Sequence, residues 1–469
     1  MMDKYNEFYK HINSLVEKFK SLEKTPVRII SHLDADGISA ASILARALKR
    51  EDIKFSISII KQLSKQKLKE FSNENYKIYF FTDLGSNNLS DIESLFINKE
   101  IFILDHHIPE KKDTSINFGN PHIFDIDGTK EIAGSGVVYL FSKFMNDINK
   151  DLAYLAIVGA LGDIQEDYLN DTKQFIGINK IILSDAQLSG KIKIELGLRM
   201  FGIQTRTLSK LLEYSTDPYI PGVTGSEEGS VQLLNELNIP VKDNQNKWRR
   251  LCDLSNEELK KLVTGIVLRR MGSEEKPEDV LGEIYTLVDE DELSPTRNAR
   301  EYASLLNACG KLGKSSLGIG VCMNDKKSKI LASELLLDYK REIIKALNWF
   351  YSNRKKENVI EERNFVLINA ENQLRDTLIG VLTSIISKSN LYNDGTIIMA
   401  MAYTPDDEIK VSLRGVNSNI DMNKLLERIN EKVQIQFGGH TAAAGCLIPL
   451  KKEKEFIEAA KDVLSKFVG

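Results

Sequence analysis

Short apolar runs alternate with amphipathic segments through the first part of the chain. Apolar side chains at three- and four-residue intervals predict helices at Ile38–Arg50 and Leu89–Ile97. Runs that suit buried strands occupy Val27–Ser31, Phe55–Ile60, Lys77–Thr82 and Ile101–Leu104. This alternation predicts an α/β fold with a doubly wound parallel sheet, whose ligands bind at the carboxyl ends of the strands.

The pattern changes near Ser215–Gly229, which is rich in proline and glycine and predicts a boundary. Residues 321–379 contain neither Pro nor Gly, and their apolar spacing predicts one long helix. Strand-like runs return at Phe365–Ile368, Thr396–Ala402 and Lys410–Leu413. The expected organisation is a catalytic domain with an N-terminal helix at 1–215, a mostly helical insert at 216–320, a linker helix at 321–360 and a smaller mixed α/β domain at 361–469.

Composition and charge narrow the class of protein. The 469 residues are 42% hydrophobic and carry a formal net charge of -4, which argues against a uniformly basic binder. A local basic groove or bound cations can still attract phosphate. The four cysteines form no CxxC pair, so a zinc cluster is not expected and a reducing cytosol fits. No apolar run reaches the roughly 18 residues that would span a bilayer. The sequence predicts a cytoplasmic protein without a membrane partner.

Aspartate and histidine residues follow several of the predicted strands. Each acidic residue alone has an ordinary structural reading: Asp36 could cap a helix, Asp83 could lie in a turn and Asp163 could end a helix. The adjacent pair His106 and His107 is harder to explain by packing. Asp and His together suit Mn²⁺ or Mg²⁺. The sequence therefore predicts a metal site where four segments meet: His32 with Asp34 and Asp36, then Asp83, then Asp105 with His106 and His107, and finally Asp163.

Four segments in this order resemble the motifs of the DHH phosphoesterase superfamily: SHLDADGISAASIL, FFTDLGS, FILDHHIPE and AIVGALGDIQED. The resemblance implies two divalent cations, Mn²⁺ preferred and Mg²⁺ possible. His32 and Asp34 would hold the first, and Asp36, His106 and Asp163 the second, with Asp83 bridging both. It also implies that His107 acts on the leaving group or a phosphate oxygen, with Asp105 orienting a histidine.

Two further segments extend the resemblance. Arg297–Gly310 (RNAREYASLLNACG) is similar to archaeal RecJ-like nucleases. The C-terminal segments SLRG and GGHTAAAG resemble the DHH-associated domain, which implies substrate binding by Ser412, Arg414, Gly438, Gly439 and His440. Arg297, Arg300, Lys311 and Lys314 are candidate contacts to a nucleic-acid backbone, although a solvated face is an equal reading.

The expected function is a metal-dependent exonuclease that degrades single-stranded DNA or RNA from an end to mononucleotides, in replication or repair. Two alternatives stay open. One is a phosphodiesterase of short oligonucleotides or cyclic dinucleotides, which shares the motifs. The other is a replisome scaffold related to RecJ. A GINS-type replisome partner is compatible with either an enzyme or a scaffold, with residues 216–295 as its docking surface. Polarity of digestion, DNA or RNA preference, the metal used in the cell and the oligomeric state do not follow from the sequence.

Overall fold

A computed structural model describes residues 2–169, 172–203, 205–215, 218–272, 277–389, 391–418, 420–440 and 443–466, leaving aside the side chains at 2, 168, 169, 172, 436 and 440. The chain divides into two compact units. Unit 1 comprises residues 1–211, 242–259 and 278–336, and unit 2 comprises residues 212–241, 260–277 and 337–469.

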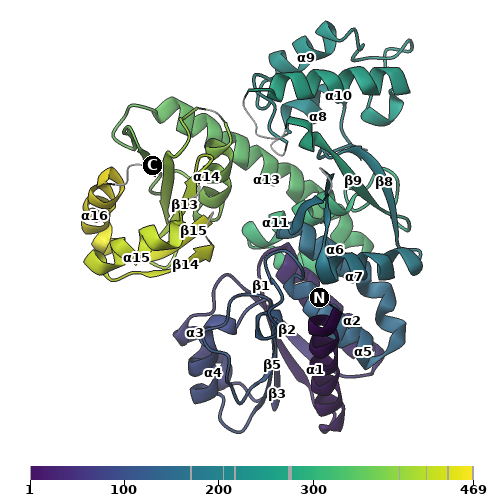
Figure 1. Ribbon diagram of the computed structural model, residues 1–469, viewed down its shortest axis with the longest axis vertical. Helices are drawn as coiled ribbons and strands as arrows, with labels where there is room; N and C mark the ends of the chain where they lie inside the picture. The colour runs from purple at the N-terminus through teal and green to yellow at the C-terminus, as the bar shows by residue number, and fades with distance from the viewer. Residues whose placement is uncertain are drawn as a thin grey trace. The chain divides into compact units, whose positions relative to one another are not determined.

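Unit 1 is built on a five-stranded sheet in which every neighbouring pair is parallel, in the order β2-β1-β3-β4-β5 (Figure 1). Its strands are β1 Val27–His32, β2 Phe55–Ile60, β3 Ile78–Thr82, β4 Glu100–Leu104 and β5 Asn117–Gly119. The helices that follow or cover them are α1 Met2–Ser21, α2 Ala35–Arg50, α3 Lys65–Ser72, α4 Leu89–Leu95, α5 Gly134–Met145, α6 Ala153–Gly162 and α7 Gly177–Leu188.

Alternating side chains bury both faces of this sheet. Phe80 of β3 stacks on Phe102 of β4, and both rings meet Phe19 of α1 and Phe141 of α5. Phe81, the next residue along β3, packs on the other face against residues of α3 and α4. Because successive strand residues point to opposite faces, these apolar runs require helices on both sides.

A second sheet in unit 1 has the order β6-β7-β9-β8. Its strands are β6 Glu166–Leu169, β7 Thr172–Phe175, β8 Ile192–Leu198 and β9 Leu281–Leu287. Two helices after it, α11 Ala299–Lys311 and α12 Ser315–Cys322, return to pack on α2, and α11 also packs on α6. The segment 278–336 therefore belongs to the same compact unit as the parallel sheet.

Unit 2 holds a six-stranded mixed sheet in the order β10-β11-β12-β13-β15-β14. The strands are β10 Val359–Glu361, β11 Phe365–Asn369, β12 Ile397–Tyr403, β13 Glu408–Gly415, β14 Gln436–His440 and β15 Ala443–Pro449. One face packs on α14 Ile379–Ser387 and the other on α15 Met422–Val433 and α16 Glu453–Lys466. The helices α9 Glu227–Glu236 and most of α10 Asn256–Arg270 also belong to this unit. The short α8 Leu208–Glu213 and the long α13 Lys326–Asn353 both run from unit 1 into unit 2.

The predicted fold class is confirmed: a doubly wound parallel-sheet domain is followed by a long helix and a smaller mixed α/β domain. Some details differ from the expectation. The long helix covers Lys326–Asn353 rather than 321–360. The insert expected to be mostly helical contains β9, and its residues from 278 onward group with unit 1. No helix in the described parts of the chain is long and apolar enough to cross a membrane.

Candidate metal centre

The predicted metal ligands meet at the carboxyl edge of the parallel sheet. His32 ends β1, Asp83 follows β3, and His106 follows β4 by two residues. Parallel register puts these strand ends side by side, and α6 brings Asp163 to the same place at its C-terminal cap. Ligand atoms lie within 4.8 Å of one another in three groups that share Asp83. Two of them correspond to the predicted ligand sets: His32, Asp34 and Asp83, and Asp36, Asp83, His106 and Asp163. The third consists of Asp83, Asp105, His106 and His107.

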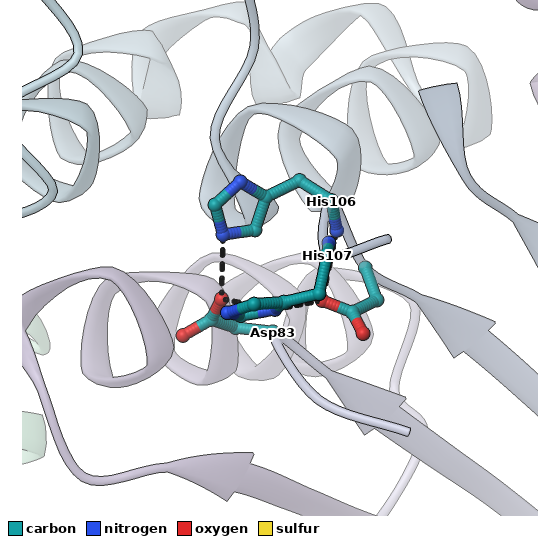
Figure 2. Close-up of side chains that lie close together, drawn as sticks. Asp83, His106 and His107 are labelled. Carbon is teal, nitrogen blue, oxygen red and sulfur yellow. Dashed lines mark hydrogen bonds and ion pairs between the residues drawn. The ribbon is translucent and has the colours of Figure 1, made fainter. Parts of the chain in front are cut away.

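Asp83 lies at the centre of both predicted ligand sets. Its side chain is 1% exposed, and neither carboxylate oxygen has a hydrogen-bond partner in the described structure. Figure 2 shows the rings of His106 and His107 beside this carboxylate, with His106 Nε2 3.3 Å and His107 Nδ1 4.0 Å from Asp83 Oδ1. Oδ2 lies 3.7 Å from His32 Nδ1. A buried carboxylate without donors is costly unless a cation meets it, so the residues present fit divalent metal ions.

Asp36 is held in place by the start of α5. Its carboxylate accepts hydrogen bonds from the backbone of Gly134 at 2.7 Å and of Ser135 at 3.0 Å, and from the Ser135 hydroxyl. Burial, together with the charges of Asp83 and Asp163, raises the pKa of Asp36 well above its usual value. This crowding of carboxylates is what a cation would relieve.

His32 and Asp34 form a close pair at the start of α2. His32 Nδ1 lies 2.7 Å from Asp34 Oδ2, and Asp34 Oδ1 accepts the backbone N–H of Gly37 as the helix cap. Burial alone would raise the pKa of Asp34, but the His32 charge and hydrogen bond lower it. The capping expected of an acidic residue here is therefore done by Asp34, and Asp36 points into the cluster.

Asp105 organises the turn that carries both histidines. Its Oδ1 lies 2.8 Å from His107 Nδ1 and accepts the backbone N–H of His106, also at 2.8 Å. Its Oδ2 accepts the backbone N–H of Ser86. Burial would raise the pKa of Asp105, but the neighbouring His107 lowers it. The imidazole orientation is thereby fixed.

A support for His106 was missed by sequence reasoning. His106 Nδ1 donates to the carbonyl of Gly128 at 2.5 Å, and Gln165 Nε2 donates to the same oxygen at 2.8 Å. Asn179 in turn donates to Gln165 Oε1 at 2.7 Å. This chain leaves His106 Nε2 directed at Asp83 and Asp163. The only sequence signal was the position of Gln165, two residues after Asp163.

A second missed support comes from α11. Asn307 Oδ1 accepts the backbone N–H of Ala35 at 3.0 Å. At Gly310, an added Cβ would lie 1.7 Å from the carbonyl oxygen of Leu33, so only glycine allows this approach. The segment that resembles RecJ-like nucleases thus supports the loop between His32 and Asp36.

The two arginines of this segment make contacts within the protein. Arg300 makes a bidentate ion pair with Glu166, whose side chain is fully buried, and Arg297 donates to the carbonyls of Val288 and Glu290. Both side chains hold protein groups, so the expectation that they contact a nucleic-acid backbone is not supported.

The predicted substrate-binding residues lie together on the sheet of unit 2. Ser412 of β13 and Gly438 of β14 both pair with Gly445 of β15, and Arg414 and His440 both pair with Ala443. The His440 side chain lies outside the described structure, as do Thr441 and Ala442. Ser412 Oγ lies 3.3 Å from Thr383 Oγ1 of α14.

Arg414 of β13 is partly buried. Burial lowers its pKa, and no carboxylate pairs with it among the described residues. A partly buried guanidinium without an acidic partner is suited to bind an anion.

Comparison with known proteins identifies the domains. Residues 26–160 match the DHH family, N-terminal domain, residues 200–282 the DHH-CID domain, and residues 373–466 the DHHA1 domain. The chain belongs to the DHH superfamily. An uncharacterized protein from Methanocaldococcus jannaschii is 29% identical to this DHH protein in an alignment of 478 positions that covers 99% of each chain.

Solved structures share the fold of this DHH protein. RecJ from Thermus thermophilus in complex with Mn²⁺ matches with a TM-score of 0.61 and 15% identity, over 98% of this chain and 55% of RecJ. CDC45 from Entamoeba histolytica matches with a TM-score of 0.63 and 11% identity, over 99% of both chains. At such identities these likenesses concern the fold, and the activity has to be argued from the site.

Proposed function

We propose that this DHH phosphoesterase is a metal-dependent exonuclease that hydrolyses single-stranded DNA or RNA from an end and releases mononucleotides. The observation that carries the proposal is the buried Asp83 carboxylate, which has no hydrogen-bond donor and is shared by both ligand groups. Such a carboxylate fits a bridge between two divalent cations, with His32 and Asp34 on one side and Asp36, His106 and Asp163 on the other.

The protein's own groups supply the rest of the chemistry. When bound, the cations would activate a water molecule and neutralise phosphate charge. His107, with its Nδ1 held by Asp105, would present its outer nitrogen to a phosphate oxygen or to the leaving group. Arg414 would bind a substrate phosphate, because its guanidinium is partly desolvated and has no acidic partner among the described residues.

A replisome scaffold with a GINS-type partner is the second candidate, favoured by the likeness in fold to CDC45 over 99% of each chain. The ligand groups argue for the enzyme. A scaffold gains nothing from a buried carboxylate that accepts no hydrogen bond, and a well-packed apolar residue would cost the fold less. An enzyme can also dock on a replisome, so partner binding alone would not decide between the two.

The test is digestion of end-labelled single-stranded DNA and RNA of about 30 nucleotides with Mn²⁺ or Mg²⁺. The proposal expects mononucleotides as the early product, weak activity on blunt duplexes and no cleavage of a circular single strand. The Asp163→Asn variant, which lacks one candidate ligand, controls for contaminating nuclease. Preferential turnover of an excess of dinucleotide would favour the short-oligonucleotide alternative, and cuts in the circle would contradict end-directed digestion.

Binding gives an independent measurement. A strand held along several cationic contacts displaces counterions, so log affinity should fall with log salt at a slope of roughly -0.7 per contact. A slope that corresponds to three contacts or more would support a long bound strand. A slope that corresponds to one contact would fit a dinucleotide hydrolase instead.

A further inference from the structure

The helix that carries Asp163 ends in an unusual way. Asp163 is the C-terminal cap of α6, and the next residue, Ile164, has φ of 57°. The N–H of Ile164 donates to the carbonyl of Leu161, and the N–H of Gln165 to that of Ala160. These two bonds define a Schellman motif, in which the residue after the cap takes the left-handed conformation. Glycine is the usual residue there because it has no Cβ.

Isoleucine is a costly choice for this position. Most of the other non-glycine residues with positive φ in the described structure are Asp or Asn, and none of them is β-branched. The left-handed conformation brings Cβ close to the following carbonyl oxygen, and branching at Cβ adds to that crowding. The cost is not offset by packing, since Ile164 is 61% exposed.

The exposed side chain lies next to the metal centre. Asp163 Oδ2 is 3.3 Å from His106 Nε2, and Ile164 is bonded directly to Asp163. Ile108, which follows His107, is 60% exposed. Both candidate ligand segments are thus followed at once by a solvent-facing isoleucine. A strained conformation that persists without a packing benefit indicates a functional constraint.

We propose that Ile164, together with Ile108, provides an apolar contact for the base of the nucleotide whose phosphate lies at the metal centre. The inference rests on the proposed nuclease function and adds a specificity-determining residue to it. Every base presents an apolar face, so such a contact would bind nucleotides with little regard to sequence and would favour a nucleotide over other phosphodiesters. The left-handed backbone is then what turns the Ile164 side chain outward, because Gln165 has to turn inward to support His106.

The test compares Ile164→Gly with the wild-type full chain. Glycine removes both the strain and the side chain. Native-state hydrogen exchange of the α6 peptide should slow by about threefold or more, because the C-terminal turn opens less often. With an ordinary single-stranded end, KM should rise about tenfold at unchanged kcat, since a contact equal in ground and transition states is lost. With an abasic terminal nucleotide, variant and wild type should have the same KM.

Ile164→Asn and Lys355→Gly complete the design. Asparagine tolerates the left-handed conformation and restricts the backbone more than glycine does. If Ile164→Asn raises KM as much as Ile164→Gly, the change in KM does not come from a more flexible backbone at residue 164. Lys355 has φ of 62° and belongs to unit 2, so Lys355→Gly relieves the same kind of strain outside the unit that holds the candidate ligands. The kinetics of this variant should match those of the wild type. Ile108→Ala should raise KM in the same direction as Ile164→Gly.

Three results would overturn the inference: faster exchange of α6 in Ile164→Gly, unchanged KM on the ordinary end, or an equal loss on the abasic end. A shift in the Mn²⁺ dependence of the rate would assign Ile164 to holding Asp163 and would also overturn it. Failure of the nuclease proposal looks different. The wild type would then cleave bis(p-nitrophenyl) phosphate with Mn²⁺ but no single strand of either nucleic acid.

Discussion

Replacing Asp83 with asparagine tests the bridging role with little disturbance of the backbone. Asp83 has φ of 57°, and Asn adopts the left-handed conformation about as readily as Asp, whereas Ala does not. The two side chains have the same shape. Asp83→Asn therefore changes the charge and one donor atom and leaves the local fold in place. We expect loss of metal-dependent hydrolysis and of stabilisation by Mn²⁺.

The size of the expected loss in rate follows from the surroundings of the two carboxylate oxygens of Asp83. Oδ1 faces His106 and Oδ2 faces His32, so each oxygen belongs to a different ligand group. The amide of asparagine keeps one oxygen acceptor, but its N–H₂ faces the other ligand group. An amide N–H₂ cannot bind a cation. Loss of one ligand atom and of the shared charge should lower the rate of hydrolysis at least a thousandfold, which corresponds to about 4 kcal/mol of transition-state stabilisation.

The assay is hydrolysis of end-labelled single-stranded DNA across a Mn²⁺ series, with calorimetric titration of Mn²⁺ on the same preparations. With Mn²⁺ at 100 times its dissociation constant, the free energy of unfolding of the wild-type protein should rise by about 2.7 kcal/mol. For the variant the rise should be much smaller. Asp52→Asn is the matched control, since Asp52 is an exposed aspartate with φ of 55°. If Asp83→Asn keeps more than a tenth of the wild-type rate at saturating Mn²⁺, the bridging role is wrong.

Other substitutions separate the parts of the site. Arg414→Gln should leave the Mn²⁺ stoichiometry intact and reduce the salt slope of single-strand binding by about 0.7; a lost metal in the titration would contradict phosphate binding. Gln165→Leu should raise the Mn²⁺ dissociation constant about 10- to 100-fold, with the rate restored at high Mn²⁺, because it weakens the support of His106. A rate that stays low at every Mn²⁺ concentration would point to another role. Glu166→Gln removes the buried negative charge that pairs with Arg300 and Arg199 and should lower the free energy of unfolding of unit 1 by about 3 kcal/mol in urea. A change below about 1 kcal/mol would count against this role of Glu166.

The strands and the polar residues that follow them were predictable because their signals are local. A buried parallel strand reads as a short apolar run, and β1 to β4 begin and end within a residue or so of the predicted runs. The first polar residue after such a run lies at the ligand edge of the sheet. The positions of His32, Asp83 and His106 therefore followed from the pattern, although their roles as ligands stay a prediction.

The supports were not predictable, because they depend on contacts between distant segments. Asn307 reaches Ala35 across 272 positions, and Asn179 reaches Gln165 only after the chain has formed β6 and β7. An asparagine or glutamine in a helix or turn carries no sign of its partner. The second sheet was missed for a similar reason: β8 alternates exposed and buried residues weakly, and its partner β9 is more than 80 positions away.

The energetic state of the centre argues for a cation independently of any resemblance. Gly134 lies so close that a Cβ there would come within 2.8 Å of Asp83 Oδ1, which leaves no room for a side-chain donor on that side. At Gly159 a Cβ would come within 2.4 Å of Asp36 Oδ1. The backbone thus packs tightly around the carboxylates yet gives Asp83 no hydrogen bond. A fold under selection for stability alone would place a hydrogen-bond donor or an apolar group there, because a buried carboxylate that accepts no hydrogen bond is costly. A divalent cation between His32, Asp83 and His106 would offset this cost, and for that reason we favour a metal-dependent enzyme over a scaffold.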